Sequence, residues 1–356
     1  MEKIMKLKYV LLFAVWSISC YGNNTSFNPG EMWFDDDGNK INAHGGQVIK
    51  VDDLYYWIGE YRDTGRKNTG KVNEYSSKDL YNWKNEGVIL DLSRLPGKYS
   101  VERPKIIYNR KSKKFIMWFH LELNGKYRTA KAGVAISNSI NGPFKLVNQL
   151  WPNAGVLPIS TQYAVAANNL KNNIMDADSK FESRIATGNL LRDMTAFVDD
   201  DDKAYIIYSS DGNKSIQIAE LNDDYTNFNG RYIRILIGEM NEAPTLVKHD
   251  NRYFLITSGV NGFGPSSARL SFSDNIFGNW KSSGSPVKDS SKNNITTTFF
   301  SQGTYILKVN SQEVDKYIFM ADRWDPDNLN NSTYVWLPLT FENNLPTIKW
   351  HDKWQY

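Results

Sequence analysis

Short apolar runs separated by polar turns recur along most of the chain. In the first of them the polar segment His44-Gly45-Gly46 precedes the apolar run 47–51. A turn at Asp52-Asp53 follows, and then a run rich in aromatic residues, 54–58. Apolar runs of this length, bounded by Gly, Asp and Asn, are typical of β-strands. The pattern predicts an all-β chain.

The same unit occurs five times. Each copy has a polar head, a short apolar strand, a turn rich in Asp, Asn or Lys, and an aromatic-rich strand. The heads are residues 44–46, 102–104, 192–194, 242–244 and 301–303. The expected strand pairs are 47–51 with 54–58, 105–108 with 115–119, 195–198 with 204–208, 245–247 with 253–257, and 304–309 with 317–321. Four-stranded propeller blades repeat at roughly 40 to 50 residues plus insertions. We therefore predict a five-bladed β-propeller, a single domain over residues 27–356.

The longest gap between heads contains an insertion, about Trp151 to Asn189. It is rich in Asn, Ala and Ser. We expect a loop with little regular structure and at most a short helix near Thr161 to Asn173.

In a propeller the first strand of each blade lines the central axis. The equivalent heads His44, Glu102, Asp193, Glu242 and Gln302 are then expected at one end of that axis. Three carboxyl groups would share one cavity. The alternative is that these polar residues lie at strand edges and are solvated separately.

Composition agrees with a strand-rich chain. Aromatic residues make up 13% of it, with 11 Trp and 20 Tyr. Most of these rings are expected in the core, although indole and phenol rings also stack on the C–H faces of sugars. The net charge is +3 and the signs are interspersed, so nucleic acid is not an expected partner.

The N-terminus has the pattern of an export signal. Lys3, Lys6 and Lys8 precede the apolar run Tyr9–Ile18, which is too short to span a bilayer. Cys20 follows at once and is the single cysteine of the chain. We expect residues 1–26 to stand outside the fold. The predicted product is exported across the inner membrane as a periplasmic or outer-membrane lipoprotein acylated at Cys20; the alternative is an ordinary signal peptide. The lipid anchor is the one membrane contact expected, and the protein is expected to be a monomer.

Three carboxyl groups in one cavity are suited to glycoside cleavage. An inverting glycosidase uses a protonated acid and a base roughly 6.5 to 9.5 Å apart. A third carboxylate raises the pKa of the acid by repulsion.

The heads and their neighbours resemble the glycoside hydrolases of family 43, in particular the branch of exo-β-1,3-galactanases. The matching stretches are 42–46, 55–60, 102–109, 117–122, 192–194, 242–244, 257–259, 301–302 and 320–324. They are spread over all five repeats, and the likeness covers nearly all of residues 27–356.

The resemblance implies roles for the heads. It implies that Glu242 is the general acid and that Asp193 tunes and positions it. The family's usual Asp base is absent, because its place reads Ala43-His44-Gly45. The galactanase branch implicates Gln302 and Glu102 instead. A neutral amide serves as a base only through its imidic tautomer, or positions water for Glu102, and both alternatives stay open.

Six further residues are candidate contacts to the sugar: Glu60, His44, Ser258, Arg323, Trp324 and Asp211. Asp211-Gly212 stands where relatives commonly carry a pair of acids, and the insertion 151–189 is longer than usual, so substrate preference is less certain than reaction type.

No cofactor or metal is expected. Asp199–Asp202 is a run of four acids, but without EF-hand spacing a hairpin turn is the better interpretation. A structural calcium ion in the propeller axis is the one alternative, since His44 stands at the axis.

The predicted function is an inverting exo-glycoside hydrolase that releases β-galactose from β-1,3-galactan or arabinogalactan. One alternative keeps the fold but cleaves α-L-arabinofuranosyl or β-xylosyl groups. The other is a carbohydrate-binding lipoprotein without activity, suggested by the missing base.

Overall fold

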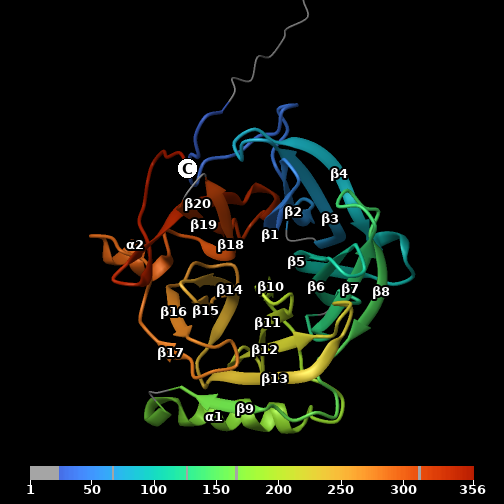
Figure 1. The fold of residues 1–356 in the computed structure, drawn as a ribbon, viewed down its shortest axis with the longest axis vertical. Coiled ribbons are helices and arrows are strands. Elements are labelled where there is room, and N and C mark those ends of the chain that lie inside the picture. Colours follow the sequence, from blue (N-terminus) through green and yellow to red (C-terminus); the bar gives the residue numbers. More distant parts are fainter. Residues whose placement is uncertain (1–23, 66–67, 126, 165–166, 312–313) are drawn as a thin grey trace, which may run out of the picture.

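The predicted repeats fold into sheets that surround a central axis (Figure 1). The computed structural model describes residues 24–65, 68–125, 127–164, 167–311 and 314–356. Within those ranges five antiparallel sheets form the blades of a propeller, and their innermost strands are β1, β5, β10, β14 and β18. The fold prediction is confirmed. Cys20 and the export signal lie outside the described residues.

Each blade is built from consecutive strands. Blade 1 contains β1 (His44–Val51), β2 (Leu54–Arg62), β3 (Asn68–Ser77) and β4 (Lys84–Asp91). Blade 2 contains β5 (Tyr99–Asn109), β6 (Lys114–Leu123), β7 (Lys131–Ser137) and β8 (Lys145–Leu150). Blade 3 contains β10 (Met194–Val198), β11 (Ala204–Ser210), β12 (Ser215–Leu221) and β13 (Phe228–Ile237), with β9 (Ser160–Tyr163) at its outer edge.

Blade 4 contains β14 (Asn241–His249), β15 (Arg252–Gly259), β16 (Ala268–Ser273) and β17 (Lys281–Ser282). Blade 5 contains β18 (Gln302–Ser311), β19 (Val314–Arg323), β20 (Thr333–Glu342) and β21 (Leu345–Ile348). The helical elements are α1 (Ala167–Glu182), α2 (Lys292–Thr297) and the short 3₁₀ turns η1 (Leu92–Arg94) and η2 (Leu329–Asn331).

Three of the five heads share a β-bulge. The pairing register shifts just after His44, Glu102 and Glu242, at the beginnings of β1, β5 and β14. The next residue has a left-handed backbone, with φ of 59° at Gly45, 53° at Arg103 and 52° at Ala243. A bulge redirects side chains and ends regular pairing. The bulge therefore sets the direction in which the side chains of these three heads point.

The core consists of apolar layers between neighbouring blades. Between blades 2 and 3 it includes Trp118, Ile206 and Tyr208, all without exposed surface. In blade 3 the strands β11 and β12 are buried along their whole length and consist mostly of apolar residues. A half-exposed strand would alternate apolar and polar residues, but both faces of these strands are covered. These layers fix the blade positions from which the polar heads project.

The two ends of the described chain meet between blades 5 and 1. Phe27 and Trp354 exchange backbone hydrogen bonds of 2.9 and 3.2 Å. The Phe27 ring also contacts Trp33 and Trp336, at centroid distances of 5.9 and 5.7 Å. Gly45 N–H donates to Asp322 Oδ2 across the same seam (2.6 Å). Since no strand is shared between the two blades, side-chain packing and these bonds close the ring.

The insertion is more regular than expected. It forms β9, parallel to β13, and the 16-residue helix α1, which covers the outer edge of blade 3 (Figure 1). The expected helix at 161–173 was wrong in position and too short. Asn-rich sequence has low helix propensity, and here tertiary packing stabilises the helix, since Ala177 and Phe181 are buried against the blade.

The acidic run at 199–202 is a hairpin turn, as interpreted. Asp202 N–H donates to the Asp199 carbonyl (3.0 Å), and Lys248 Nζ pairs with Asp199 and Asp200 at 2.6 and 2.8 Å. In the part of the chain that the structure describes, every helix is too short or too polar to cross a bilayer.

Candidate active site

At the starts of the inner strands lies a cavity of about 310 Å³. Every blade contributes to it. The lining side chains are Glu60 and Arg62 from blade 1; Glu102, Arg103 and Tyr127 from blade 2; Arg192, Asp193 and Asn213 from blade 3; Glu242, Val260 and Phe263 from blade 4; and Gln302 and Trp324 from blade 5. The structure thus brings together the four heads Glu102, Asp193, Glu242 and Gln302.

Glu242 is held by two amide donors. Gln302 Nε2 donates to its Oε1 (3.0 Å) and Asn213 Nδ2 to its Oε2 (3.3 Å). Burial and then the negative charge of Asp193 raise the pKa of Glu242 to about 7, against the lowering effect of Arg103. A carboxyl group with this pKa is still substantially protonated near neutral pH and can donate its proton.

Arg103 is the central cation of the cavity and is 5% exposed. Its Nη2 donates to Asp193 Oδ2 (3.1 Å) and to Gln302 Oε1, and its Nη1 donates to the Gly303 carbonyl (3.0 Å). Asp193 Oδ2 also accepts the backbone N–H of Ala243 (3.1 Å). Asp193 is therefore fixed beside the start of β14.

The Gln302 side chain has its amide groups fully engaged. Its Nε2 donates to Glu242 Oε1 and to Ser258 Oγ (3.1 Å). Its Oε1 accepts from Arg103 Nη2 and from Trp324 Nε1 (3.0 Å). A primary amide has two N–H donors and two acceptor lone pairs. With all four engaged, Gln302 orients the general acid candidate and has no lone pair left for a water molecule.

Glu102, from β5 of blade 2, lines the same cavity as Glu242 and pairs with Arg62 and His120. Its Oε1 accepts from Arg62 Nη2 (3.0 Å), and its Oε2 accepts from the Tyr127 hydroxyl and lies 3.4 Å from His120 Nδ1. Burial acts to raise the pKa of Glu102, but His120, Arg62 and Tyr127 outweigh it and hold that pKa well below its usual range. Glu102 is therefore ionised throughout the working pH range.

His120 lies between two glutamates. Its Nε2 is 2.9 Å from Glu122 Oε1, and its imidazole has no exposed surface. Burial acts to lower the pKa of His120, but hydrogen bonds to Glu102 and Glu122 outweigh it and raise the pKa to about 9. An imidazolium ion thus compensates the charge of Glu102.

Glu60 lines the cavity close to Glu102. It forms an ion pair with Arg62, and its Oε1 accepts the backbone N–H of Arg103 (3.1 Å). It is 1% exposed, and burial raises its pKa against the effect of Arg62. Its proposed contact to a sugar hydroxyl remains a prediction.

Aromatic rings form the apolar part of the wall. Trp324 packs edge-on against Phe263, with centroids 5.5 Å apart, and the Arg103 guanidinium lies 5.9 Å from the Trp324 ring centre. Tyr127 is half exposed at the mouth. Such rings, next to several polar groups, suit the mixed faces of a pyranose.

Four of the candidate sugar contacts do not line the cavity. Ser258 lies behind Gln302 and accepts its amide N–H, so it contacts that residue and not open space. His44 has no exposed surface, and its ring stacks on Tyr334 at 5.2 Å. Burial and then the charge of Arg62 lower the pKa of His44 to about 3, so the ring is a neutral part of the core.

Arg323 and Asp211 also point away from the cavity. Arg323 Nη2 donates to the Phe299 carbonyl (2.9 Å) and its guanidinium lies 5.6 Å from the Trp350 ring centre. Consecutive strand residues face opposite sides, so Trp324 in the cavity leaves Arg323 outside. Asp211 is buried in an ion pair with Arg234 (3.1 Å). Neither Arg323 nor Asp211 lines the cavity, so the structure gives no support for a direct contact between these two residues and the sugar.

The sequence over residues 153–334, about half of the chain, matches the family described as Glycosyl hydrolases family 43. The chain belongs to this family. The protein is a glycoside hydrolase.

Solved structures of family 43 enzymes are similar over most of the chain. The β-1,3-galactosidase BT3683, solved with galactodeoxynojirimycin, is 42% identical with a TM-score of 0.86, over 93% of this chain and 100% of that chain. The exo-β-1,3-galactanase from Clostridium thermocellum is 32% identical with a TM-score of 0.77, over 92% of this chain and 66% of that chain. The exo-β-1,3-galactanase from Phanerochaete chrysosporium, solved with β-1,3-galactotriose, is 29% identical with a TM-score of 0.75, over 94% and 68%. A comparison with curated proteins gave no match.

The sequence analysis assigned no role to several residues in or next to the cavity. Arg103 lies inside the head 102–104, and His120 follows the predicted strand 115–119, but neither was expected to act on the carboxyl groups. Arg62 lies beyond the predicted strand 54–58. Tyr127 and Asn213 lie in turns, whose reach toward the axis no strand pattern describes. These residues supply the charges and amide donors that the predicted heads require.

A cation of the protein itself occupies the propeller axis. Lys105 is fully buried, and its Nζ lies 2.8, 3.3 and 3.4 Å from the carbonyl oxygens of Gly45, Pro104 and Arg103. Burial and then the charge of Arg103 lower the pKa of Lys105 to about 7. Carbonyl oxygens are calcium ligands, but here they meet an ammonium group, so the residues do not fit an axial calcium ion.

Glu102, His120 and Asp193 bring one potential ligand atom each within 4.8 Å of one another. Both carboxylates, however, already meet arginine side chains, Glu102 that of Arg62 and Asp193 that of Arg103. This cluster does not fit a metal ion either, since a divalent ion there would meet two guanidinium groups.

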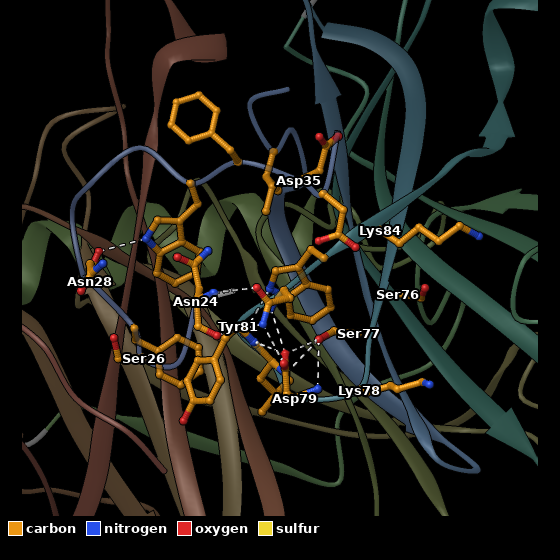
Figure 2. Close-up of a pocket in the computed structure, with 18 of the residues that line it drawn as sticks. Asn24, Ser26, Asn28, Asp35, Ser76, Ser77, Lys78, Asp79, Tyr81 and Lys84 are labelled. Carbon is orange, nitrogen blue, oxygen red and sulfur yellow. Dashed lines mark hydrogen bonds between the residues drawn. The ribbon is translucent and has the colours of Figure 1, made fainter. Parts of the chain in front are cut away.

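A larger hollow of about 800 Å³ lies elsewhere, between the N-terminal segment and the β3–β4 turn (Figure 2). Asp79 organises it by accepting from the Ser77 hydroxyl and from the backbone N–H groups of Tyr81 and Asn82. None of the five heads lines this hollow. Its polar groups stabilise the turn.

Proposed function

We propose that this family 43 enzyme removes single β-galactose units from the end of a β-1,3-galactan chain, with inversion at the anomeric carbon. The observation that carries the proposal is Glu242, a buried carboxyl group with a raised pKa beside Asp193, in one cavity with the ionised Glu102. The names of the similar structures, a β-1,3-galactosidase and exo-β-1,3-galactanases, supply the sugar and the linkage.

The cavity of about 310 Å³ has room for one terminal sugar ring. A hollow of about 930 Å³ adjoins it and shares Arg62, Glu102, Tyr127 and Phe263 with it, so there is also space next to that ring for further sugar units of the chain. Exo action is therefore proposed from the names of the similar exo-β-1,3-galactanases.

In the proposed reaction Glu242 gives its proton to the glycosidic oxygen as the bond to the anomeric carbon breaks. Gln302 and Asn213 hold the Glu242 oxygens, and Asp193 keeps the proton on Glu242 by repulsion. A water molecule attacks the anomeric carbon from the opposite face and loses a proton, which gives the inverted sugar.

We place Glu102, and not Gln302, on the side of the attacking water. Gln302 would have to give up its hydrogen bond from Arg103 or from Trp324, both of them buried or partly buried donors, before its oxygen could accept one from water. Glu102 needs to release only the Tyr127 hydroxyl, which comes from a half-exposed residue at the mouth. As a permanent anion it also stabilises the positive charge of an oxocarbenium-like transition state.

We further propose that the chain is exported and anchored in a membrane by acylation of Cys20, and that it acts as a monomer. The charged start, the short apolar run and the position of Cys20 support this. Metabolic labelling with a radioactive fatty acid is expected to mark the wild-type protein and not Cys20→Ser. Labelling of both, or of neither, contradicts the anchor.

A product analysis tests the function. The enzyme is incubated with β-1,3-galactan, arabinogalactan, arabinan and xylan, and the released sugar is identified by chromatography while its anomer is followed by NMR. We expect galactose as the first product, appearing as the α-anomer. Arabinose or xylose as the main product would mean that the enzyme cleaves arabinofuranosyl or xylosyl groups and not galactose. The β-anomer as first product would contradict inversion. Binding of the oligosaccharides without any released sugar would favour a carbohydrate-binding role.

A further inference from the structure

The turn between β11 and β12 has an unusual backbone. Asp211, Gly212 and Asn213 are consecutive left-handed residues, with φ of 53°, 71° and 64°. Ser210 and Ser215 on either side form the last pair of the hairpin. Asp, Gly and Asn are the residue types that adopt this region most readily. The position of the turn is therefore decided by its contacts with neighbouring elements.

On its inner side the turn reaches the general acid candidate. Asn213 Nδ2 donates to Glu242 Oε2 (3.3 Å), and the Asn213 carbonyl accepts the backbone N–H of Asn241 (2.8 Å), next to Glu242 in β14. Asn213 lines the cavity and is 7% exposed. Its Oδ1 is buried without a hydrogen-bond partner among the described residues. The amide is thus committed to Glu242 on its donor side alone.

On its outer side the turn is bound to helix α1. Arg234 of β13 donates from Nη2 to Asp211 Oδ2 (3.1 Å) and from Nη1 and Nη2 to Asp178 Oδ1 of the helix (3.2 Å each). The same guanidinium lies 3.9 Å from the ring centre of Phe181, one turn further along α1. Arg234 is 2% exposed, and removing one partner of such a buried ion pair is strongly destabilising because it leaves an uncompensated charge.

A second link joins the same two elements. Lys214 Nζ, in the turn, is 3.0 Å from Asp176 Oδ2 of α1. A Cβ at Gly212 would lie 3.3 Å from Cε of Lys180, so the side chain of this helix residue packs over the turn. Asp176 and Lys180 of the helix therefore contact the turn directly, and Asp178 reaches it through Arg234.

We propose that α1 acts on catalysis at a distance: it clamps the 211–214 turn, and the turn holds Asn213 as a positioning residue on Glu242. The inference rests on the proposed role of Glu242 as general acid. Without the clamp the turn shifts and withdraws the Asn213 amide. The Glu242 carboxylate then loses one of its donors, and its proton is bound more tightly.

Asn213→Ala tests the inner step. A hydrogen bond to the charged form of an acid lowers its pKa, so its removal raises the pKa of Glu242. The activity needs Glu242 protonated, so the basic limb of the pH profile of kcat/KM, measured with galacto-oligosaccharide, is expected to move up by about half to one pH unit. We expect kcat to fall about 3- to 30-fold with little change in KM.

Other charged groups facing Glu242 stay in place in this variant. They are Asp193 and Arg103 in the cavity, Arg192 and Tyr127 on its wall, and Arg269, which bonds Asn241. A shift of the limb therefore reports the lost amide.

Asp178→Asn and Asp211→Asn test the outer step. Both substitutions are expected to move the basic limb of the pH profile in the same direction as Asn213→Ala and to leave KM unchanged. When either is combined with Asn213→Ala, the limb is expected to move little further than in Asn213→Ala alone. The matched control is Asp274→Asn, which breaks an exposed pair with Arg252 on blade 4 and is expected to change neither value. Because Asp178 is partly exposed, Asp178→Asn is expected to fold even if the more deeply buried Asp211→Asn does not, and it then tests the outer step alone.

The outcomes separate the alternatives. An unshifted limb in folded Asn213→Ala and Asp178→Asn overturns the clamp, and a raised KM in Asp211→Asn would mean a sugar contact. A lower melting temperature with an unshifted limb means a purely structural role and also overturns it. If Glu242→Gln retains activity on the oligosaccharide, the role of Glu242 as general acid, and with it the proposed function, is wrong. If Glu242→Gln loses activity but the basic limb of the pH profile does not move in Asn213→Ala, the proposed function stands and only the clamp is wrong.

Discussion

Glu102 and Arg103 are adjacent in sequence, yet both side chains line the cavity. In a regular strand neighbouring side chains face opposite sides. The bulge at the start of β5, with φ of 53° at Arg103, removes that restriction. One short segment thereby supplies an ionised carboxylate and the guanidinium that orders Asp193 and Gln302.

A chemical-rescue experiment separates Glu102 from Gln302. Glu102→Ala removes the carboxylate on the water side, so azide, itself an anionic nucleophile, is expected to enter the space beside Arg62 and His120 and restore turnover by at least tenfold. The expected product is the α-galactosyl azide, identified by NMR.

Gln302→Ala is the comparison. It removes a donor to Glu242 and leaves Trp324 and Arg103 without their acceptor, so kcat is expected to fall about 10- to 100-fold without rescue by azide. Rescue of Gln302→Ala and not of Glu102→Ala would contradict the assignment and favour the imidic tautomer.

At this scale the sequence predicted the heads but not their partners. Glu102, Asp193, Glu242 and Gln302 stand at equivalent points of a repeat, so the propeller axis predicts that they converge, although the equivalent His44 is buried in the core and does not line the cavity. The partner of Asp211 could not be inferred, because Arg234 lies two strands further along and Asp178 lies in an insertion. Asp211 was consequently expected at the sugar, and in the structure it is buried in an ion pair with Arg234.

At the scale of elements the bulged inner strands and the insertion behave differently. The inner strands were predictable because short apolar runs with a period of one blade leave few alternatives. Helix α1 was not, because Asn-rich sequence has weak helical preference and the stabilising contacts of Ala177 and Phe181 come from blade 3. An insertion that covers an outer strand edge also protects that edge from pairing with other chains.

For the whole molecule the seam between blades 5 and 1 is the decisive feature. Each blade is a continuous stretch of chain, so no strand ties the ends together. Aromatic packing closes the ring instead, with Phe27 touching Trp33, Trp336 and Trp354 at centroid distances of 4.7 to 5.9 Å. Because the cavity is lined by residues from all five blades, a loosened seam would also move the cavity residues of blades 1 and 5 apart.

Phe27→Ala is expected to lower the free energy of unfolding by about 3 to 5 kcal/mol, because it empties a buried aromatic site at the seam. Denaturant unfolding followed by tryptophan fluorescence measures this. Leu157→Ala, at a side chain that is 62% exposed, is the control and is expected to change the value by less than about 0.5 kcal/mol. Equal effects of the two changes would contradict closure by the terminal segment.

The central claim is that Glu242 delivers a proton to the leaving oxygen. The most direct measurement compares Glu242→Gln with wild type on β-1,3-galactan and on a dinitrophenyl β-galactoside, whose leaving group needs no proton. We expect kcat/KM to fall about a hundredfold or more on the polymer and far less on the activated substrate. The wild-type rate on the polymer is expected to decline above the Glu242 pKa of about 7. Near-normal hydrolysis of the polymer, or an equal loss on both substrates, would contradict the account.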